Sequence, residues 1–157
     1  MSVVVSEEAG AVLAAELDAL LPAFEGARRE RYLALAAAVR AGEVGDEHVP
    51  ELESVLELAL STARARRLYS AEGERLLTDV LRRTPRGRDL QEQLDQVNRA
   101  LRTVTGATLR SASVRMRTLG HFTVTITSDA ASLTLAVRPD GVAVEAVSVG
   151  EPAGAAG

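Results

Sequence analysis

The first half of the chain places apolar residues at the spacing of a helix face. Residues 6–24 and 28–41 repeat leucine, alanine or valine every three or four positions, and a third such stripe begins at Pro50. Ser6 precedes two glutamates and suits a helix N-cap, and Gly42 suits a helix stop. We therefore expect helices over these three segments.

Two interruptions are expected before the middle of the chain. Residues 42–49 lack an apolar period and predict a loop. The third stripe runs on to Ala63, and we expect a break near Tyr69-Ser70. A fourth helix then contains residues 76–81 and ends before Pro85, because the residue preceding a proline disfavours the helical conformation. The first part of the chain is thus predicted to be a bundle of about four helices.

A fifth helix is expected after Pro85-Arg86-Gly87, which is the best candidate for a boundary between two segments. Apolar residues recur in it at spacings of four, three, four and three, namely Leu90, Leu94, Val97, Leu101 and Val104. This narrow seam is typical of a helix that packs along one line, either on a sheet or bundle or against a second helix in a dimer. Since the seam is only about two heptads long, we favour packing within the chain.

Beyond Gly106 the hydrophobic period changes from helical to alternating. Apolar and polar residues alternate over four short runs, at residues 113–118, 122–127, 132–137 and 142–145. Such alternation predicts half-buried antiparallel strands, and the links between the runs are short enough for hairpins.

The expected fold is therefore α+β, with an N-terminal helical bundle followed by a helix packed on a four-stranded antiparallel β-meander. We expect a helical segment at residues 1–86, the helix and meander at 87–150, and a disordered tail at 151–157.

Charge is segregated along the chain. Residues 1–63 have a net charge of −8, residues 64–117 of +7 and residues 118–157 of −3. All 18 basic residues are arginine, which a GC-rich coding bias explains more simply than selection does. A candidate contact surface is formed by Arg64, Arg66, Arg67, Arg82, Arg83, Arg86 and Arg88. Guanidinium groups suit phosphate, but the acidic first segment could neutralise these arginines instead.

Composition removes several classes of function. The chain has no cysteine, which excludes disulfides, thiolate metal sites and a cysteine nucleophile. It has no lysine either, which excludes a lysine Schiff base. Aromatic residues make up only 3%, which disfavours binding of single strands by base stacking. The first residues do not resemble a signal peptide, and no apolar run reaches the length of a membrane helix, so we expect a cytoplasmic location.

Candidate chemistry is sparse. His48 and His121 lie far apart in sequence and show no ligand spacing, so each is interpreted as a surface or turn histidine. Glu53 and Glu57 share a helix face, and we interpret them as a solvated acidic surface rather than a metal site. We assign no catalytic, metal-binding or cofactor-binding residue and expect no cofactor.

The leading hypothesis is a non-enzymatic protein-interaction module that binds another protein or itself as a homo-oligomer. The first alternative, which we favour less, is a nucleic-acid-associated regulator that uses the arginines of residues 64–88. The second is a small-ligand binder or enzyme with a pocket between sheet and helices. We do not expect the chain to bind a membrane.

Overall fold

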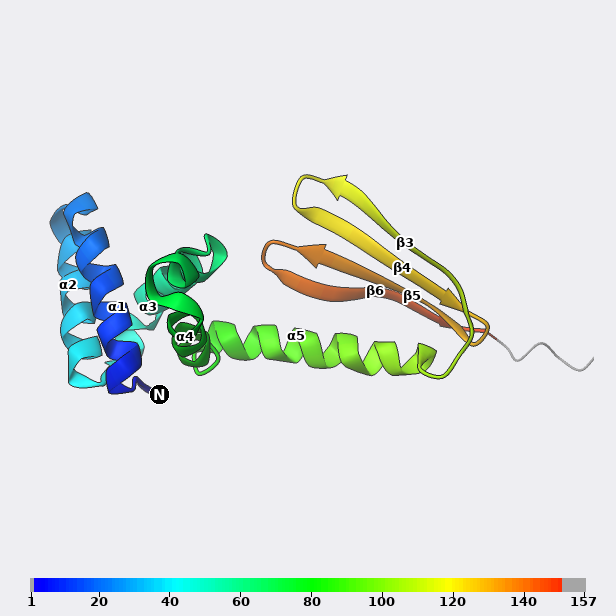
Figure 1. Ribbon diagram of the computed structural model, residues 1–157, viewed down its shortest axis with the longest axis horizontal. Coiled ribbons are helices and arrows are strands. Elements are labelled where there is room, and N and C mark those ends of the chain that lie inside the picture. The colour runs from blue at the N-terminus through cyan, green and yellow to red at the C-terminus, as the bar shows by residue number, and fades with distance from the viewer. Residues whose placement is uncertain (1, 151–157) are drawn as a thin grey trace, which may run out of the picture. The chain divides into compact units, whose positions relative to one another are not determined.

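A computed structural model describes residues 2–150 of the chain (Figure 1). It has the expected α+β fold, in which helices come first and a helix packed with a four-stranded antiparallel sheet follows. The chain divides after Arg88 into two compact units, and this division falls inside one continuous helix. The expected disordered tail at 151–157 lies outside the described residues.

The first unit is a helical bundle with a small two-stranded sheet. Its helices and strands are β1 (Ser2–Val4), α1 (Glu7–Leu20), α2 (Gly26–Ala41), β2 (Glu43–Gly45), α3 (Val49–Ser61) and α4 (Arg64–Leu81). Two 3-10 turns, η1 (Leu21–Ala23) and η2 (Asp46–His48), connect them. Strands β1 and β2 pair antiparallel, with Val3 opposite Val44.

The apolar stripes seen in the sequence form the core of this bundle. Leu13 and Leu17 of α1, Leu35 of α2 and Leu56 of α3 are fully buried together. The caps act as expected, because the Ser6 hydroxyl accepts a hydrogen bond from the first turn of α1. Gly42 closes α2 in the left-handed conformation, with φ at +83°.

Two sequence expectations for this unit were wrong. Residues 42–49 are not a plain loop, because they contain β2 and η2. The third helix ends at Ser61, although its apolar stripe continues to Ala63. Ala63 adopts a left-handed conformation there, and α4 begins at once. The break expected near Tyr69-Ser70 is confirmed, since Ser70 interrupts α4 with φ at +65°.

The second unit joins a helix to a meander. Helix α5 (Pro85–Leu101) begins in the first unit and is followed by the turn η3 (Arg102–Val104). The strands are β3 (Leu109–Thr118), β4 (His121–Ser128), β5 (Ala131–Arg138) and β6 (Gly141–Val149). They pair in the order β3-β4-β5-β6, and every pair is antiparallel, which confirms the predicted meander. His121 is the first residue of β4 rather than part of the turn.

Helix α5 packs on the apolar face of this sheet. Val97 of α5 is buried against Leu133 and Leu135 of β5, and Leu101 packs beside them. The Gln93 side chain accepts a hydrogen bond from the backbone N–H of Val142, which ties the helix to β6. Figure 1 shows β3 as the strand farthest from α5, and no β3 side chain takes part in this core.

Candidate interaction surface

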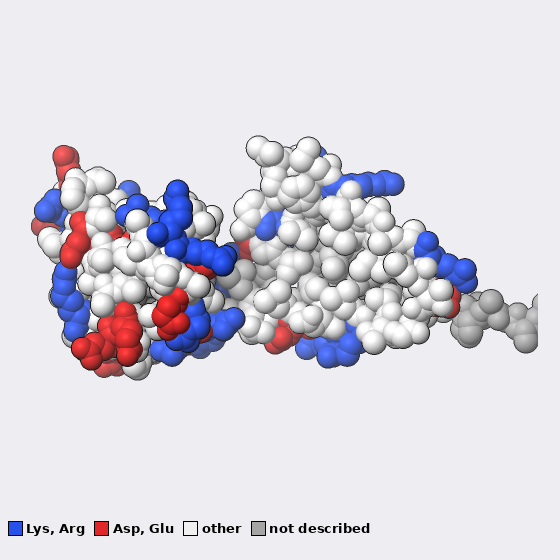
Figure 2. Space-filling view, in the orientation of Figure 1, with Lys and Arg blue, Asp and Glu red and all other residues white. Residues whose placement is uncertain are grey.

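The arginines singled out in the sequence all lie in the first unit, and most of them make contacts there. Arg64 and Arg86 pair with glutamates of α1 and α3, whereas Arg66 and Arg82 pair with acids of α4. Arg83 and Arg88 donate hydrogen bonds to backbone carbonyls. Figure 2 shows blue and red side chains intermixed over this unit. Most of these guanidinium groups therefore already have a carboxylate or carbonyl partner within the first unit.

A buried carboxylate connects α1 to α4. Glu16 is only 1% exposed, and it accepts hydrogen bonds from Arg64 Nε at 2.8 Å and from the Tyr69 hydroxyl at 2.7 Å. Burial, the hydrogen bond to Glu16 and the charge of Glu16 raise the pKa of Tyr69 to about 12, while the charge of Arg64 acts in the opposite direction. The sequence held a signal for this network, since Glu16 lies on the same face of α1 as Leu13 and Leu17.

Glu53 and Glu57 hold the start of α5 rather than forming a wholly solvated acidic face. Glu53 Oε1 accepts a hydrogen bond from the backbone N–H of Arg86 at 2.8 Å. Glu57 Oε1 lies 3.0 Å from Arg86 Nε. The interpretation of these two glutamates as free surface acids was therefore incomplete, because helix α3 uses them to anchor the first turn of α5.

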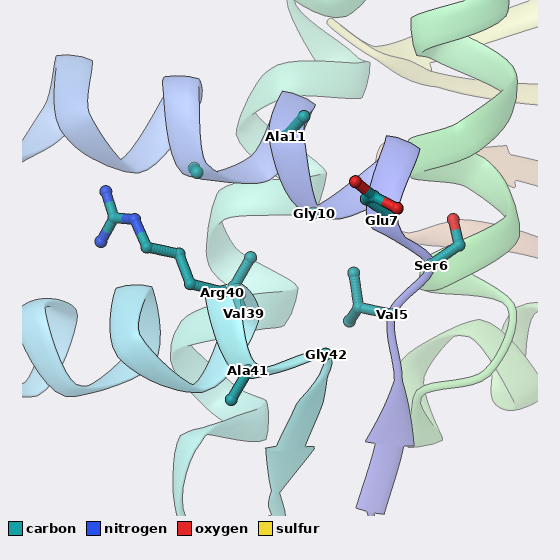
Figure 3. A pocket seen from close by; sticks show the side chains of 10 residues that line it. Val5, Ser6, Glu7, Gly10, Ala11, Val39, Arg40, Ala41 and Gly42 are labelled. Atoms are coloured by element: carbon teal, nitrogen blue, oxygen red, sulfur yellow. The ribbon is translucent and has the colours of Figure 1, made fainter.

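An open groove of about 410 Å³ lies between the start of α1 and the end of α2 (Figure 3). Its walls are mainly small residues such as Gly10, Ala11 and Ala41. Figure 3 shows the Glu7 carboxylate and the Arg40 guanidinium at opposite ends of the groove, and Arg40 pairs with Asp18. The groove thus lacks the converging polar groups that a reaction needs.

The two histidines lie in different units and do not share a site. His48 lies in η2 with Nε2 3.8 Å from Glu47 Oε1, and His121 is exposed at the start of β4. Within residues 2–150, no three histidine, aspartate or glutamate side chains lie close enough together to hold a metal ion.

The feature that remains is an apolar surface on the sheet, which we call the open face and define as Val114, Met116, Phe122 and Val137. Met116, Phe122 and Val137 are opposite one another across β3, β4 and β5, so they form one row on the side of the sheet that α5 covers elsewhere. Val114 is 66% exposed and Met116 is 64% exposed. Neither residue was singled out in the sequence as a candidate.

The width of α5 explains why Val114 and Met116, on the β3 side of the open face, are uncovered. A helix with its side chains is about 10 Å across, whereas neighbouring strands lie about 4.8 Å apart. One helix therefore covers about two strands of a four-stranded sheet, and α5 is centred on β5. Of the predicted seam, Val97 is buried and Leu101 packs on the core, but Leu94 is 47% exposed.

The opposite face of the sheet is polar, as the alternation predicted. Thr123, Thr125 and Thr134 lie on it, and Arg117 of β3 forms an ion pair with Glu145 of β6 at 3.0 Å. Arg115 lies on the same face of β3 as Ser113, and it makes no ion pair or hydrogen bond with any residue between 2 and 150. The edge strand thus carries exposed apolar side chains on one face and an unpaired cation on the other.

Comparison with family models, with curated proteins and with solved structures found no match to this chain. Among the helices that the structure describes, none combines the length and the apolar character needed to cross a membrane.

Proposed function

We propose that this chain is a non-enzymatic protein-interaction module that works through the open face. The observation that supports this proposal is the exposure of Val114 and Met116 on a face whose other half is a packed core. Contiguous exposed apolar surface is costly in water and marks contact sites in folded proteins. Single exposed apolar residues elsewhere, such as Leu33 on α2, carry no such meaning.

The other hypotheses have weaker support. A nucleic-acid-associated regulator would need exposed guanidinium groups along one surface, but most arginines of residues 64–88 are engaged by carboxylates or carbonyls of the first unit. An enzyme would need polar groups that converge in a cavity, and the groove beside α1 offers mainly small apolar walls.

The test compares Met116→Asp with a matched control, Leu33→Asp. Both substitutions place a carboxylate at an exposed apolar position, so the folded state should tolerate them equally. Association is measured as molar mass by light scattering across protein concentrations, and as the amount of co-purifying protein. We expect Met116→Asp to reduce association at least tenfold and Leu33→Asp to leave it unchanged. Equal association of the wild type and both variants would contradict the proposal.

A further inference from the structure

The start of α2 and the start of α3 line another open pocket, with a volume of about 310 Å³. Its lining residues are Arg28, Arg31 and Tyr32 of α2 and Pro50, Glu51 and Ser54 of α3. This volume is at the lower end of the range for ligand pockets, so it suits a small chemical group. The pocket lies entirely within the first unit, whereas the open face belongs to the second. A ligand here would therefore use contacts that the open face does not supply.

Arg28 of this pocket is held over two aromatic rings. Its guanidinium carbon lies 4.4 Å from the centre of the Phe24 ring and 5.8 Å from the centre of the Tyr32 ring. These rings are two of the four aromatic residues in the chain, so half of its rings position this one cation. Stacking orients the plane of the guanidinium group and leaves its N–H edge free to donate. Arg28 makes no ion pair or hydrogen bond with any residue between 2 and 150, so an oriented cation is available to a ligand.

The Tyr32 hydroxyl is a second donor without a partner. Tyr32 is only 5% exposed, and its hydroxyl makes no hydrogen bond with any residue that the structure describes. A tyrosine buried to this extent usually finds a hydrogen-bond partner. The hydroxyl still meets solvent, and the pocket is the opening beside Tyr32. A ligand in the pocket would therefore supply the missing acceptor.

The remaining polar residues of the pocket set its charge. Arg31 Nε lies 3.0 Å from Glu51 Oε1, and the Glu51 side chain is 15% exposed. The Ser54 hydroxyl donates to the carbonyl of Pro50 at 2.9 Å, so its hydrogen is already used. Two guanidinium groups and one carboxylate give the lining a net charge of +1. A ligand group with a single negative charge matches this balance, whereas Glu51 would repel a dianion such as sulfate.

We propose that this pocket binds the carboxylate group of a ligand, with Arg28 as the main charged donor and the Tyr32 hydroxyl as the second donor. The fork of a guanidinium group matches the two oxygens of a carboxylate, and such hydrogen bonds are among the stronger ones in proteins. The ligand is a small organic acid or the acidic side chain of another protein, because both present the same group. This site goes beyond the proposed function, and either can fail without the other.

Titration of the full chain with sodium acetate tests this site, with sodium chloride added to keep the ionic strength constant. The chain has two tyrosines, so their ring signals can be followed separately by NMR in the wild-type protein. We expect a saturable shift of the Tyr32 signals, with a dissociation constant on the order of 1 mM, because a single group on an open surface binds weakly. The Tyr69 signals should not move, because the Tyr69 hydroxyl already donates to Glu16 at 2.7 Å.

Substitutions in and outside the pocket identify the donors. Arg28→Gln should weaken acetate binding at least tenfold, because it removes the charge and the forked donors. Arg40→Gln is the matched control, since Arg40 is also exposed on α2 but pairs with Asp18 outside the pocket, and it should leave the dissociation constant unchanged. Glu51→Gln removes the opposing charge and should tighten acetate binding at least twofold. This gain does not depend on how well Arg28→Gln folds, and circular dichroism checks the folding of each variant.

A second probe, N-acetyl-glutamic acid amide, separates the two sources of the carboxylate, because it carries the group on an amino-acid side chain. Binding at least tenfold tighter than acetate would assign the site to a protein side chain, and equal binding would assign it to a small organic acid. A Tyr32 shift that does not saturate, or equal weakening by Arg28→Gln and Arg40→Gln, would refute the site. Tighter binding of sulfate than of acetate to the wild type would contradict the match to a single negative charge.

Discussion

Tyr69→Phe removes one of the two hydrogen bonds that the structure gives to the carboxylate of Glu16. The ring stays and only the hydroxyl is lost, so the packing between α1 and α4 is kept. The carboxylate is 1% exposed, and water cannot readily replace the missing donor. Arg64 still donates to the other oxygen, at 2.8 Å.

The expected cost follows from leaving a buried acceptor unsatisfied. Such a loss destabilises a protein by about 1–3 kcal/mol. Part of the cost is recovered if Arg64 shifts to bind both oxygens, so we expect a value near the lower end. The free energy of unfolding is measured from urea titrations followed by circular dichroism, since the chain has no tryptophan.

Glu16→Leu is the informative companion variant, because it removes the carboxylate that accepts the Tyr69 hydrogen bond. Tyr69→Phe should therefore destabilise the wild-type protein more than it destabilises the Glu16→Leu protein. If Tyr69→Phe changes the unfolding free energy by less than about 0.5 kcal/mol, the hydrogen bond is not stabilising and the reasoning fails.

Three further results are expected. Because the pKa of Tyr69 in the folded protein is raised from 10.0 to about 12, the contribution of Tyr69 to folding stability is complete below pH 10 and is lost as the pH rises to about 12. The difference in absorbance at 295 nm between the wild type and Tyr69→Phe should titrate near pH 12, and a midpoint near 10 would refute this. Glu53→Ala should cost about 1 kcal/mol, because it removes the acceptor of the Arg86 N–H in the first turn of α5. Glu53→Gln keeps an acceptor oxygen and should largely retain stability; equal losses would show that the charge of Glu53, not the hydrogen bond, matters. Leu133→Ala should lower the free energy of unfolding, measured by thermal denaturation, by about 2–5 kcal/mol. Leu119→Ala, at an exposed position, should change it little; similar values for the two variants would contradict the sheet core.

Long periodic segments made the fold predictable from sequence. The stripes that became α1, α2 and α5 are each at least three turns long, and the alternation over β3 to β6 persists through four runs. In both cases many neighbouring side chains favour the same secondary structure, so the local preference agrees with the tertiary packing. The Ser6 cap and the Gly42 stop were readable for the same reason, because each follows from local backbone chemistry.

Short or long-range features were not predictable. β1 and β2 contain three residues each and pair across about 40 positions of sequence, so neither carries a period of its own. The end of α3 at Ser61 is set by the left-handed Ala63, a residue with no intrinsic preference for that conformation. The pairing of Glu16 with Tyr69 depends on how α1 meets α4, which no local pattern specifies.

The open face could have been inferred from the number of elements. The alternation predicted one apolar face over four strands, and the sequence offered one helix to cover it. Because a helix covers about two strands, an uncovered half was a geometric consequence of the fold already predicted. The sequence did not predict which half of the apolar face α5 would cover, because that depends on the contacts of Val97 and Gln93 with β5 and β6.

The segregated charge of the chain is used in part inside the first unit, and the arginines of β3 differ from those used there. Arg64 and Arg86 meet glutamates from the acidic segment, whereas Arg115 meets no acid among residues 2–150. A charged side chain on an edge strand hinders pairing with an arbitrary strand, because most registers leave it opposite an apolar residue or a like charge. It does not hinder a partner that offers a hydroxyl or a carboxylate at that position. Arg115 therefore disfavours pairing of β3 with strands that would place an apolar residue or a like charge opposite it.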